Sequence, residues 1–503
     1  MAYDARQLHD LAGTEKGRKL NMAELLPNPD RITSMLTRRE LLGCAPMVFA
    51  RAAATPKRNV LFIAIDDLND WVGCLGGYRG VQTPNLDALA RQGVLFRSAH
   101  CAAPLCNPAR AAILTGRQPH STGVYDNNQP LSGSTALEGV TTLNQHFKNS
   151  GYVTLGSGKI YHGTYGKFAD KKGWDDYGMT PDRMKLPKEG LQGGVGARGN
   201  FDFGPTETGD EDMHDFETAR WVSGHLSRRQ PQPLFLAFGV TRPHLPWHVP
   251  KKYFDLYPLD AITVPLVKED DLEDVPAIGK RMALQGKDHE RITQAGAWKQ
   301  AVQAYLASIT FADAMVGKVL RALETGPHAQ NTTVMLWSDH GWHLGEKLHW
   351  RKFTLWERST RNVLMVKSPG ITQPGGVCDS AVSMMNLFPT LIEMEGLGKA
   401  GVQDGVSMMP LLKNPRAKWQ RPVLTTYGLE NHTIRTGGVK EGWRYIRYRD
   451  GGEELYDRTR DPNEWTNLAS SRDFAVKKSE LAAYLPIINE PDAPRSTGGP
   501  TEV

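Results

Sequence analysis

The sequence predicts an α/β protein with a mostly parallel, doubly wound sheet and a smaller C-terminal domain built on an antiparallel sheet. Continuous apolar runs, typical of strands buried on both faces, alternate with helical patterns along most of the chain. Several of these runs end in charged or histidine residues. From about residue 415 the pattern changes to short alternating runs with a Gly-Gly turn, which is typical of antiparallel hairpins.

Four apolar runs are the predicted core strands, and each leads into polar side chains suited to chemistry. Ligands of such sheets bind outside the carboxyl ends of parallel strands, so we expect these side chains to meet in one site. The runs are residues 59–66, ending in Asp66 with Asp67 next; residues 151–162, a strand and glycine turn leading to Lys159 and His162; residues 233–240, followed by His244; and residues 332–339, ending in Asp339 with His340 next.

Two helices are predicted between these strands. Residues 83–93 fit a short helix with Thr83 as N-cap and Gly93 as its stop. Residues 303–326 carry apolar side chains at spacings of three and four, which predicts one buried face of a long helix. That face contains Tyr305, Ile309, Ala312, Val316, Val319 and Leu323.

Residues 1–54 predict a leader and a twin-arginine export signal, so we expect a periplasmic or secreted bacterial protein. Arg38 and Arg39 precede a short apolar stretch and then small residues suited to cleavage. A short buried helix is the alternative interpretation, and Met35 is an alternative translation start. No apolar run approaches the ~20 residues of a membrane span.

The rest of the chain divides into three predicted parts. Residues 55–414 are the predicted catalytic domain, residues 415–485 the antiparallel subdomain and residues 486–503 a flexible tail. The formal net charge of +5 is compatible with an anionic substrate. The absence of a dense Lys/Arg stripe with interleaved aromatic residues argues against nucleic acid as a partner.

Cys106 stands at a predicted helix start, where a thiol is unexpected. Pro108 suits the first turn of a helix, and a helix N-terminus favours an anion. Arg110 lies one turn further on and faces the same end. The pattern indicates an oxyanion pocket containing a nucleophile, with a buried structural cysteine as the alternative. With Cys44 removed in the signal and Cys106 reserved for chemistry, three thiols remain, which allows at most one disulfide.

The same stretch resembles the signature of the type I, formylglycine-dependent sulfatases of the alkaline phosphatase superfamily. The resemblance extends over roughly residues 57–470, and the local sequence is most similar to the iduronate-2-sulfatase group in "IDDLND", "GKIYHG" and "RPHLPWHVPKKY". The signature C-x-P-x-R-x-x-x-L-T-G-R is matched at every fixed position by Cys106, Pro108, Arg110, Leu114, Thr115, Gly116 and Arg117.

The resemblance implies that Cys106 is oxidised after translation to formylglycine by a formylglycine-generating enzyme, which recognises Pro108 and Arg110. A hydrated aldehyde offers two hydroxyls on one carbon. One attacks sulfur and expels the alcohol, and loss of the proton from the other releases sulfate and regenerates the aldehyde.

The resemblance also implies one divalent cation. Asp66, Asp67, Asp339 and His340 match the family's metal ligands, together with the group made from Cys106. Carboxylate oxygens suit Ca²⁺, which takes six to eight oxygens at ~2.3–2.6 Å, and Mg²⁺ is an open alternative. Many sulfatases have Asn at the position of His340. Turn capping is the alternative role for each Asp pair.

Four further residues complete the family's pattern. Lys159 and Lys352 would bind sulfate oxygens. His244 would protonate the leaving alcohol with Lys352 beside it, and His162 would be the base that helps to collapse the intermediate. Lys347 competes with Lys352 for its assignment. Trp247, His248 and His432 are further candidates to line a substrate subsite.

The favoured function is hydrolysis of sulfate esters of sulfated sugars or glycosaminoglycan-like polysaccharides, with a sulfated carbohydrate as substrate. One alternative is a phosphonate, phosphodiester, aryl sulfate or choline sulfate hydrolase of the same superfamily. Another is a non-catalytic binder of sulfated glycan, which predicts an unconverted Cys106 and the loss of metal ligands. The chain retains every ligand position, which argues against the binder.

Overall fold

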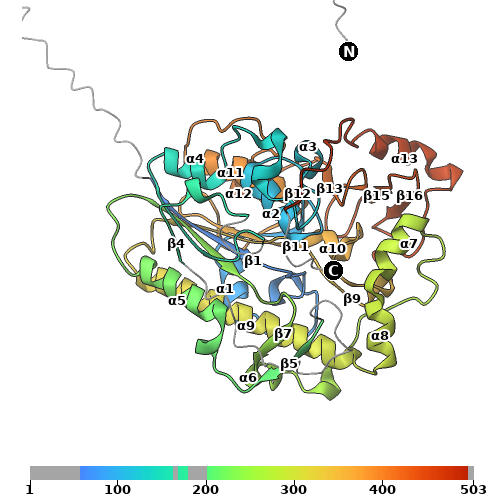
Figure 1. The fold of residues 1–503 in the computed structure, drawn as a ribbon, viewed down its shortest axis with the longest axis horizontal. Helices are drawn as coiled ribbons and strands as arrows, with labels where there is room; N and C mark the ends of the chain where they lie inside the picture. The colour runs from blue at the N-terminus through green and yellow to red at the C-terminus, as the bar shows by residue number, and fades with distance from the viewer. Residues whose placement is uncertain (1–56, 163–167, 179–200, 497–503) are drawn as a thin grey trace, which may run out of the picture. The chain divides into compact units, whose positions relative to one another are not determined.

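The computed structural model describes residues 57–162, 168–178 and 201–496 (Figure 1). The predicted export signal, residues 1–54, lies outside the described residues. The described residues belong to one compact unit that begins at Lys57. The predicted boundary between residues 414 and 415 stays a prediction.

The core is an eight-stranded, mostly parallel sheet, as predicted. Its strand order is β12-β2-β11-β8-β1-β6-β3-β4, and β11 pairs antiparallel with both of its neighbours while the other described pairings are parallel. The strands are β1 (Asn59–Ile65), β2 (Val94–His100), β3 (Val153–Gly158), β4 (Asp176–Gly178), β6 (Leu234–Val240), β8 (Thr332–Ser338), β11 (Arg361–Lys367) and β12 (Gly376–Ser383).

The four predicted core strands are β1, β3, β6 and β8, and they lie next to one another in the order β8-β1-β6-β3. The sequence interpretation did not identify β2, β4, β11 or β12. β12 is an edge strand with a half-exposed pattern and a register shift between Cys378 and Ala381, so it lacks the continuous apolar run of a central strand.

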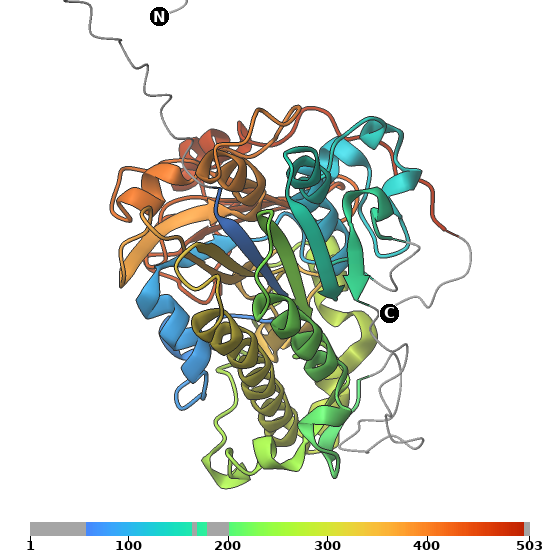
Figure 2. The same ribbon diagram turned by 90° about the vertical axis from the view of Figure 1, so that its left-hand side faces the viewer.

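Helices cover both faces of the sheet (Figure 1), and β1 shows why. Its alternate side chains enter two separate apolar clusters, one containing Leu61 and Ile63 and the other containing Val60 and Phe62. Figure 2 shows α5 and α9 side by side on the first face. Helices α1 (Pro84–Gln92), α5 (His214–Leu226) and α9 (Trp298–Thr325) cover that face, and α2 (Cys106–Thr115), α4 (Leu143–Asn149) and α11 (Leu387–Met394) cover the other.

The two predicted helices are present, with one correction. All six residues of the predicted apolar face of α9 are buried. Thr83 precedes α1 as expected, but its side chain accepts a hydrogen bond from Gly73 N instead of capping the helix. The cap comes from Asp313 of α9, whose Oδ1 accepts from Leu86 N at 2.8 Å. A cap supplied by another helix leaves no mark at the helix start in the sequence.

The predicted antiparallel sheet is also present. It has the order β13-β14-β15-β16, with antiparallel pairing throughout. Thr426 N donates to Ala102 O at 2.9 Å, which joins this sheet to the segment that leads into α2. The strands are β13 (Val423–Thr426), β14 (His432–Arg435), β15 (Trp443–Arg447) and β16 (Glu453–Asp457), followed by α13 (Ala475–Ala482).

The segment predicted as a flexible tail differs from that expectation in its described part, residues 486–496. Glu490 N donates to His120 O at 2.8 Å, Ala493 N donates to Gly123 O at 2.8 Å, and Ala493 is buried. The sequence predicted a flexible tail, but backbone hydrogen bonds to α3 (Pro119–Thr122) and to Gly123, the residue after it, hold this segment in place.

Among the residues that the structure describes, no helix combines the length and apolar character needed to cross a membrane. Cys74, Cys101, Cys106 and Cys378 are all free thiols.

Candidate active site

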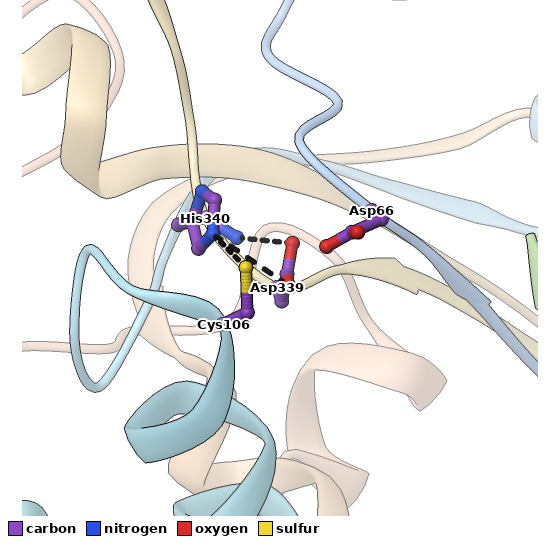
Figure 3. A group of neighbouring side chains, drawn as sticks. All are labelled: Asp66, Cys106, Asp339 and His340. Atoms are coloured by element: carbon purple, nitrogen blue, oxygen red, sulfur yellow. Dashed lines mark hydrogen bonds and ion pairs between the residues drawn. The ribbon is translucent and has the colours of Figure 1, made fainter. Parts of the chain in front are cut away.

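The carboxyl ends of β8, β1, β6 and β3 bring the predicted polar residues to one edge of the sheet. These four strands are adjacent and parallel, so the residues that follow them emerge side by side. Asp66 and Asp67 follow β1, Asp339 follows β8, and Lys159 follows β3. Cys106 begins α2 on one face of this edge, and Figure 3 shows its sulfur pointing at the carboxylates and His340.

Cys106 is fully buried in this polar cluster. Its Sγ lies 3.0 Å from Lys352 Nζ and 3.4 Å from His340 Nε2. Burial, with a further contribution from the negative charge of Asp66, raises the pKa of the Cys106 thiol to about 11. The unmodified side chain is therefore a neutral thiol at physiological pH and a weak nucleophile.

Arg110 joins two of the carboxylates. Its side chain is only 1% exposed, with Nη2 at 3.0 Å from Asp66 Oδ1 and Nε at 2.9 Å from Asp339 Oδ2. Its Nη1 donates to Lys159 O. Burial raises the pKa of Asp339. Burial acts in the same direction on Asp66, but the positive charges of Lys159 and Arg110 outweigh it and hold the pKa of Asp66 well below its usual range.

Two lysines extend the charge pairing. Lys159 Nζ forms an ion pair with Asp66 Oδ2, and Lys352 Nζ lies 2.8 Å from Asp67 Oδ1. With Arg110, these lysines match the three buried carboxylates charge for charge. A site balanced in this way can accept a divalent cation together with an anionic substrate without accumulating excess charge of one sign.

The same cluster fits a divalent cation. One ligand atom from each of Asp66, Cys106, Asp339 and His340 lies within 4.8 Å of the others. His340 Nδ1 lies 3.1 Å from Gly341 O, which can only accept a hydrogen bond, so we assign the proton to Nδ1. The lone pair of Nε2 then faces the cluster, 3.4 Å from Asp67 Oδ1.

Asp67 provides the second sign of a cation site. Its Oδ2 is buried and accepts no hydrogen bond from the residues that the structure describes. A buried carboxylate oxygen left in this state is costly unless a cation neutralises it. An alternative four-residue set, equally close, contains Asp66, Asp67, Cys106 and His244, so the geometry admits His244 near the cation as well.

His244 lies beside the cluster and is partly exposed. Its side chain is 15% exposed, and Nε2 lies 3.9 Å from Asp67 Oδ2. Nδ1 lies 2.6 Å from Leu245 O, which can only accept a hydrogen bond, so we assign a proton to Nδ1. Nε2 is then the nitrogen that can take up or release a proton. Arg242 is buried beneath this loop and donates to His244 O at 3.0 Å, which fixes the loop backbone.

The other candidate histidines and Trp247 are placed differently. His162 is buried further along the loop after β3, with its ring edge-on to Phe168 at 5.5 Å. Trp247 is fully buried, and its Nε1 donates to Pro243 O at 2.6 Å. His248 and His432 are also buried, in contact with Asp202 and Thr426. A role for Trp247, His248 and His432 in lining a substrate subsite stays a prediction.

The structure distinguishes the two candidate lysines of the segment after β9 (His343–Leu344). Lys352 reaches Cys106, whereas Lys347 is buried elsewhere, 2.7 Å from Asp271 Oδ1.

Sequence reasoning missed Asp271. It also missed a second role of Tyr305, whose hydroxyl donates to Asp67 O at 2.7 Å. Tyr305 was identified only as part of an apolar helix face, and nothing in its spacing indicates a polar partner.

Comparison with known proteins agrees with this arrangement. The sulfatase family matches residues 58–397, and the family N-sulphoglucosamine sulphohydrolase, C-terminal, matches residues 345–489. A sulfatase of Formosa agariphila is 38% identical over 455 residues, covering 86% of this chain and 87% of that protein. Iduronate 2-sulfatase of Mus musculus is 30% identical over 423 residues, covering 74% and 75%.

A solved structure shows the same fold. The phosphonate monoester hydrolase of Agrobacterium radiobacter superposes with a TM-score of 0.69 at 20% identity, covering 85% of this chain and 94% of that one. Fold and family match together define a hydrolase of the alkaline phosphatase-like class, with a buried polar cluster at the carboxyl edge of its sheet. The chain belongs to the sulfatase family, whose members hydrolyse sulfate esters.

Proposed function

We propose that this protein is a formylglycine-dependent sulfatase that acts on a sulfated sugar. The observation that carries the proposal is the position of Cys106 at the start of α2, in contact with Lys352 and His340 and beside three buried carboxylates. This arrangement supplies a nucleophile position, positive charge for a sulfate group and a cation site in one place.

Burial raises the pKa of the Cys106 thiol to about 11, so the unmodified thiol is a weak nucleophile. Conversion to formylglycine supplies the nucleophile instead. A hydrated formylglycine supplies one hydroxyl that attacks sulfur and a second whose deprotonation releases sulfate. Lys159 and Lys352 hold the sulfate oxygens, because their flexible ammonium groups can turn toward an anion, whereas the guanidinium of Arg110 is held between Asp66 and Asp339. Arg110 keeps Asp66 and Asp339 in place.

His244 is the proposed general acid. Its side chain is partly exposed, its Nε2 lies 3.9 Å from Asp67 Oδ2, and its Nδ1 is held by Leu245 O. General acid catalysis of this kind contributes about 10²–10⁴-fold for a poor leaving group. His162 is the proposed base that acts after the alcohol has left.

Asp66, Asp67, Asp339 and His340 are the proposed ligands of the cation. The ion would supply charge stabilisation to the reacting oxygens. The three carboxylates favour Ca²⁺, and Mg²⁺ is the alternative.

The proposed substrate is a sulfated carbohydrate, and the relationship to iduronate 2-sulfatase makes a 2-O-sulfated uronate the first candidate. The fold alone also fits phosphorus esters, because the phosphonate monoester hydrolase superposes on it. The intact set of proposed ligands and lysines disfavours a non-catalytic binder. Maturation by a formylglycine-generating enzyme and twin-arginine export are part of the proposal.

A substrate screen tests this function. Purified, matured enzyme is assayed against defined sulfated mono- and disaccharides, choline sulfate, an aryl sulfate and an aryl phosphodiester, with Cys106→Ala as the matched control. The proposal expects the highest kcat/KM for one sulfated sugar and none for the control. Preference for the phosphodiester would replace it with the phosphorus-ester hydrolase, and equal inactivity of both proteins would favour the glycan binder.

A further inference from the structure

The loop that carries Lys352 has a backbone that its sequence does not favour. This segment, residues 345–353, is called the Lys352 loop below. Gly345 is its one glycine, yet four other residues adopt the left-handed region that L side chains rarely occupy. Such conformations persist only where surrounding contacts hold them. The residues are Lys347, Leu348, Arg351 and Phe353, with φ of 57°, 51°, 76° and 76°.

Three contacts tie this loop to one segment, residues 271–288, which we call the clamp segment. Lys347 Nζ also donates to Glu464 O, which lies outside that segment. The clamp segment includes α7 (Ala277–Leu284) and ends at the first residue of α8 (Asp288–Gln294). Alternate residues of the loop contact it, in the same order along both segments. The contacts are Lys347 Nζ to Asp271 Oδ1 at 2.7 Å, His349 Nδ1 to Ala283 O at 2.7 Å and Arg351 Nε to Asp288 Oδ2 at 2.7 Å.

Lys352 faces away from these anchors and toward the reaction site. Its Nζ lies 3.0 Å from Cys106 Sγ and 2.8 Å from Asp67 Oδ1. His349 links the two sides, because its Nε2 contacts Lys352 O at 2.5 Å while its Nδ1 contacts the clamp segment. The clamp segment therefore reaches the backbone of Lys352 through a single side chain.

The two charged anchors are well shielded from solvent. The Lys347 and Asp271 side chains are 3% and 1% exposed, and Lys347 Nζ also lies over the Trp356 ring at 5.4 Å. The Arg351 and Asp288 side chains are 12% and 9% exposed. Charged side chains are rarely buried to this degree unless they are paired, so both pairs tie the loop firmly to the clamp segment.

We propose that the clamp segment positions Lys352 for the reaction, with Asp271 and Asp288 as positioning residues that act through Lys347 and Arg351. The inference rests on the proposed function, because it takes Lys352 as a group that contacts the sulfate. A displacement of about 1 Å at a reacting group costs up to about 10²-fold in rate. A purely structural role would instead lower stability without a specific connection to Lys352.

A double-mutant cycle separates these two roles. Asp288→Asn is made in the wild-type enzyme and in Lys352→Ala, and kcat/KM for an aryl sulfate is measured with matured, metal-loaded protein. The proposal expects a loss of about 10–100-fold in the wild type. In the Lys352→Ala background it expects a loss of no more than about twofold, because the group being positioned is already gone. Asp288→Glu should recover part of the loss.

Controls keep the result interpretable. Asp255→Asn removes an exposed ion pair with Lys251 and should change neither background. Asp271→Asn should repeat the result of Asp288→Asn at the second anchor. If turnover of Lys352→Ala is too slow to measure, the same cycle is measured by calorimetric binding of inorganic sulfate.

Two outcomes would overturn the inference. Equal losses from Asp288→Asn in both backgrounds would show a general structural effect. Full activity of Lys352→Ala would remove Lys352 from the reaction altogether. In that case Cys106→Ala decides separately whether the formylglycine-dependent activity stands.

Discussion

Replacing Arg110 by methionine should destabilise the protein strongly. Arg110→Met keeps an apolar stem but removes the charge between Asp66 and Asp339, both of which are fully buried. Breaking a buried ion pair from one side typically costs 3–5 kcal/mol, since the partner charge stays desolvated. Lys159 still faces Asp66, so Asp339 carries most of the penalty. We expect a loss of about 3–5 kcal/mol at pH 7.

The loss should depend on pH in a defined direction. The pKa of Asp66 is held well below its ordinary value by Lys159 and Arg110, so its stabilising contribution is present above the unfolded pKa. That contribution disappears as pH falls through the folded pKa. In Arg110→Met the pKa of Asp66 rises, and the pKa of Asp339, which burial already raises, rises further. Protonation of these carboxyls removes the penalty of an unpaired buried charge, so the difference between the two proteins is largest near neutral pH and shrinks as pH falls.

The measurement is urea unfolding followed by circular dichroism after chelation of divalent ions, at pH 7 and at decreasing pH. Arg220→Met is the matched control, because Arg220 is 69% exposed and pairs with Glu217 at the surface. Removal of such a pair changes stability by about 0–1 kcal/mol. An Arg110→Met loss as small as that of the control would refute the assigned role of the buried guanidinium.

Three further predictions concern the reaction groups. His244→Ala should slow hydrolysis of a sugar sulfate about 10²–10⁴-fold and that of an activated aryl sulfate far less, because a phenolate leaves without a proton. Equal slowing of both substrates would exclude His244 as the acid. His162→Ala should slow both substrates alike, and substrate-dependent slowing would contradict its late role. Asp339→Asn should release the cation on dialysis and abolish turnover, which metal analysis and an activity assay on the same sample would show. Retention of metal with full activity would count against the proposed ligand set.

The sequence predicted the central strands and the polar residues after them because both leave local patterns. Residues 59–66 form a continuous apolar run that ends in Asp66, with Asp67 next, and adjacency in a parallel sheet then brings these two aspartates to Asp339. The edge strand β12 left no such pattern, since its exposed positions interrupt the apolar run.

The residues that hold the site in place could not be predicted from local sequence patterns. Asp313 caps a helix more than 200 residues away, and Asp271 holds Lys347 across a separation of 76 residues. These pairings depend on how elements pack in three dimensions, and no spacing rule connects their partners. The same reason explains why the described part of the C-terminal segment was expected to be flexible, although its backbone forms hydrogen bonds with α3 and with Gly123.

In the proposed mechanism, Cys106 becomes the aldehyde that performs the reaction. Mass spectrometry of the tryptic peptide 98–110 tests this claim most directly, with protein purified in active form from its native host or from cells that contain a formylglycine-generating enzyme. The peptide also contains Cys101, so fragmentation must locate the change. We predict the thiol-to-aldehyde mass loss at Cys106 and an unmodified Cys101. A fully active preparation in which Cys106 is an unmodified thiol would contradict the mechanism.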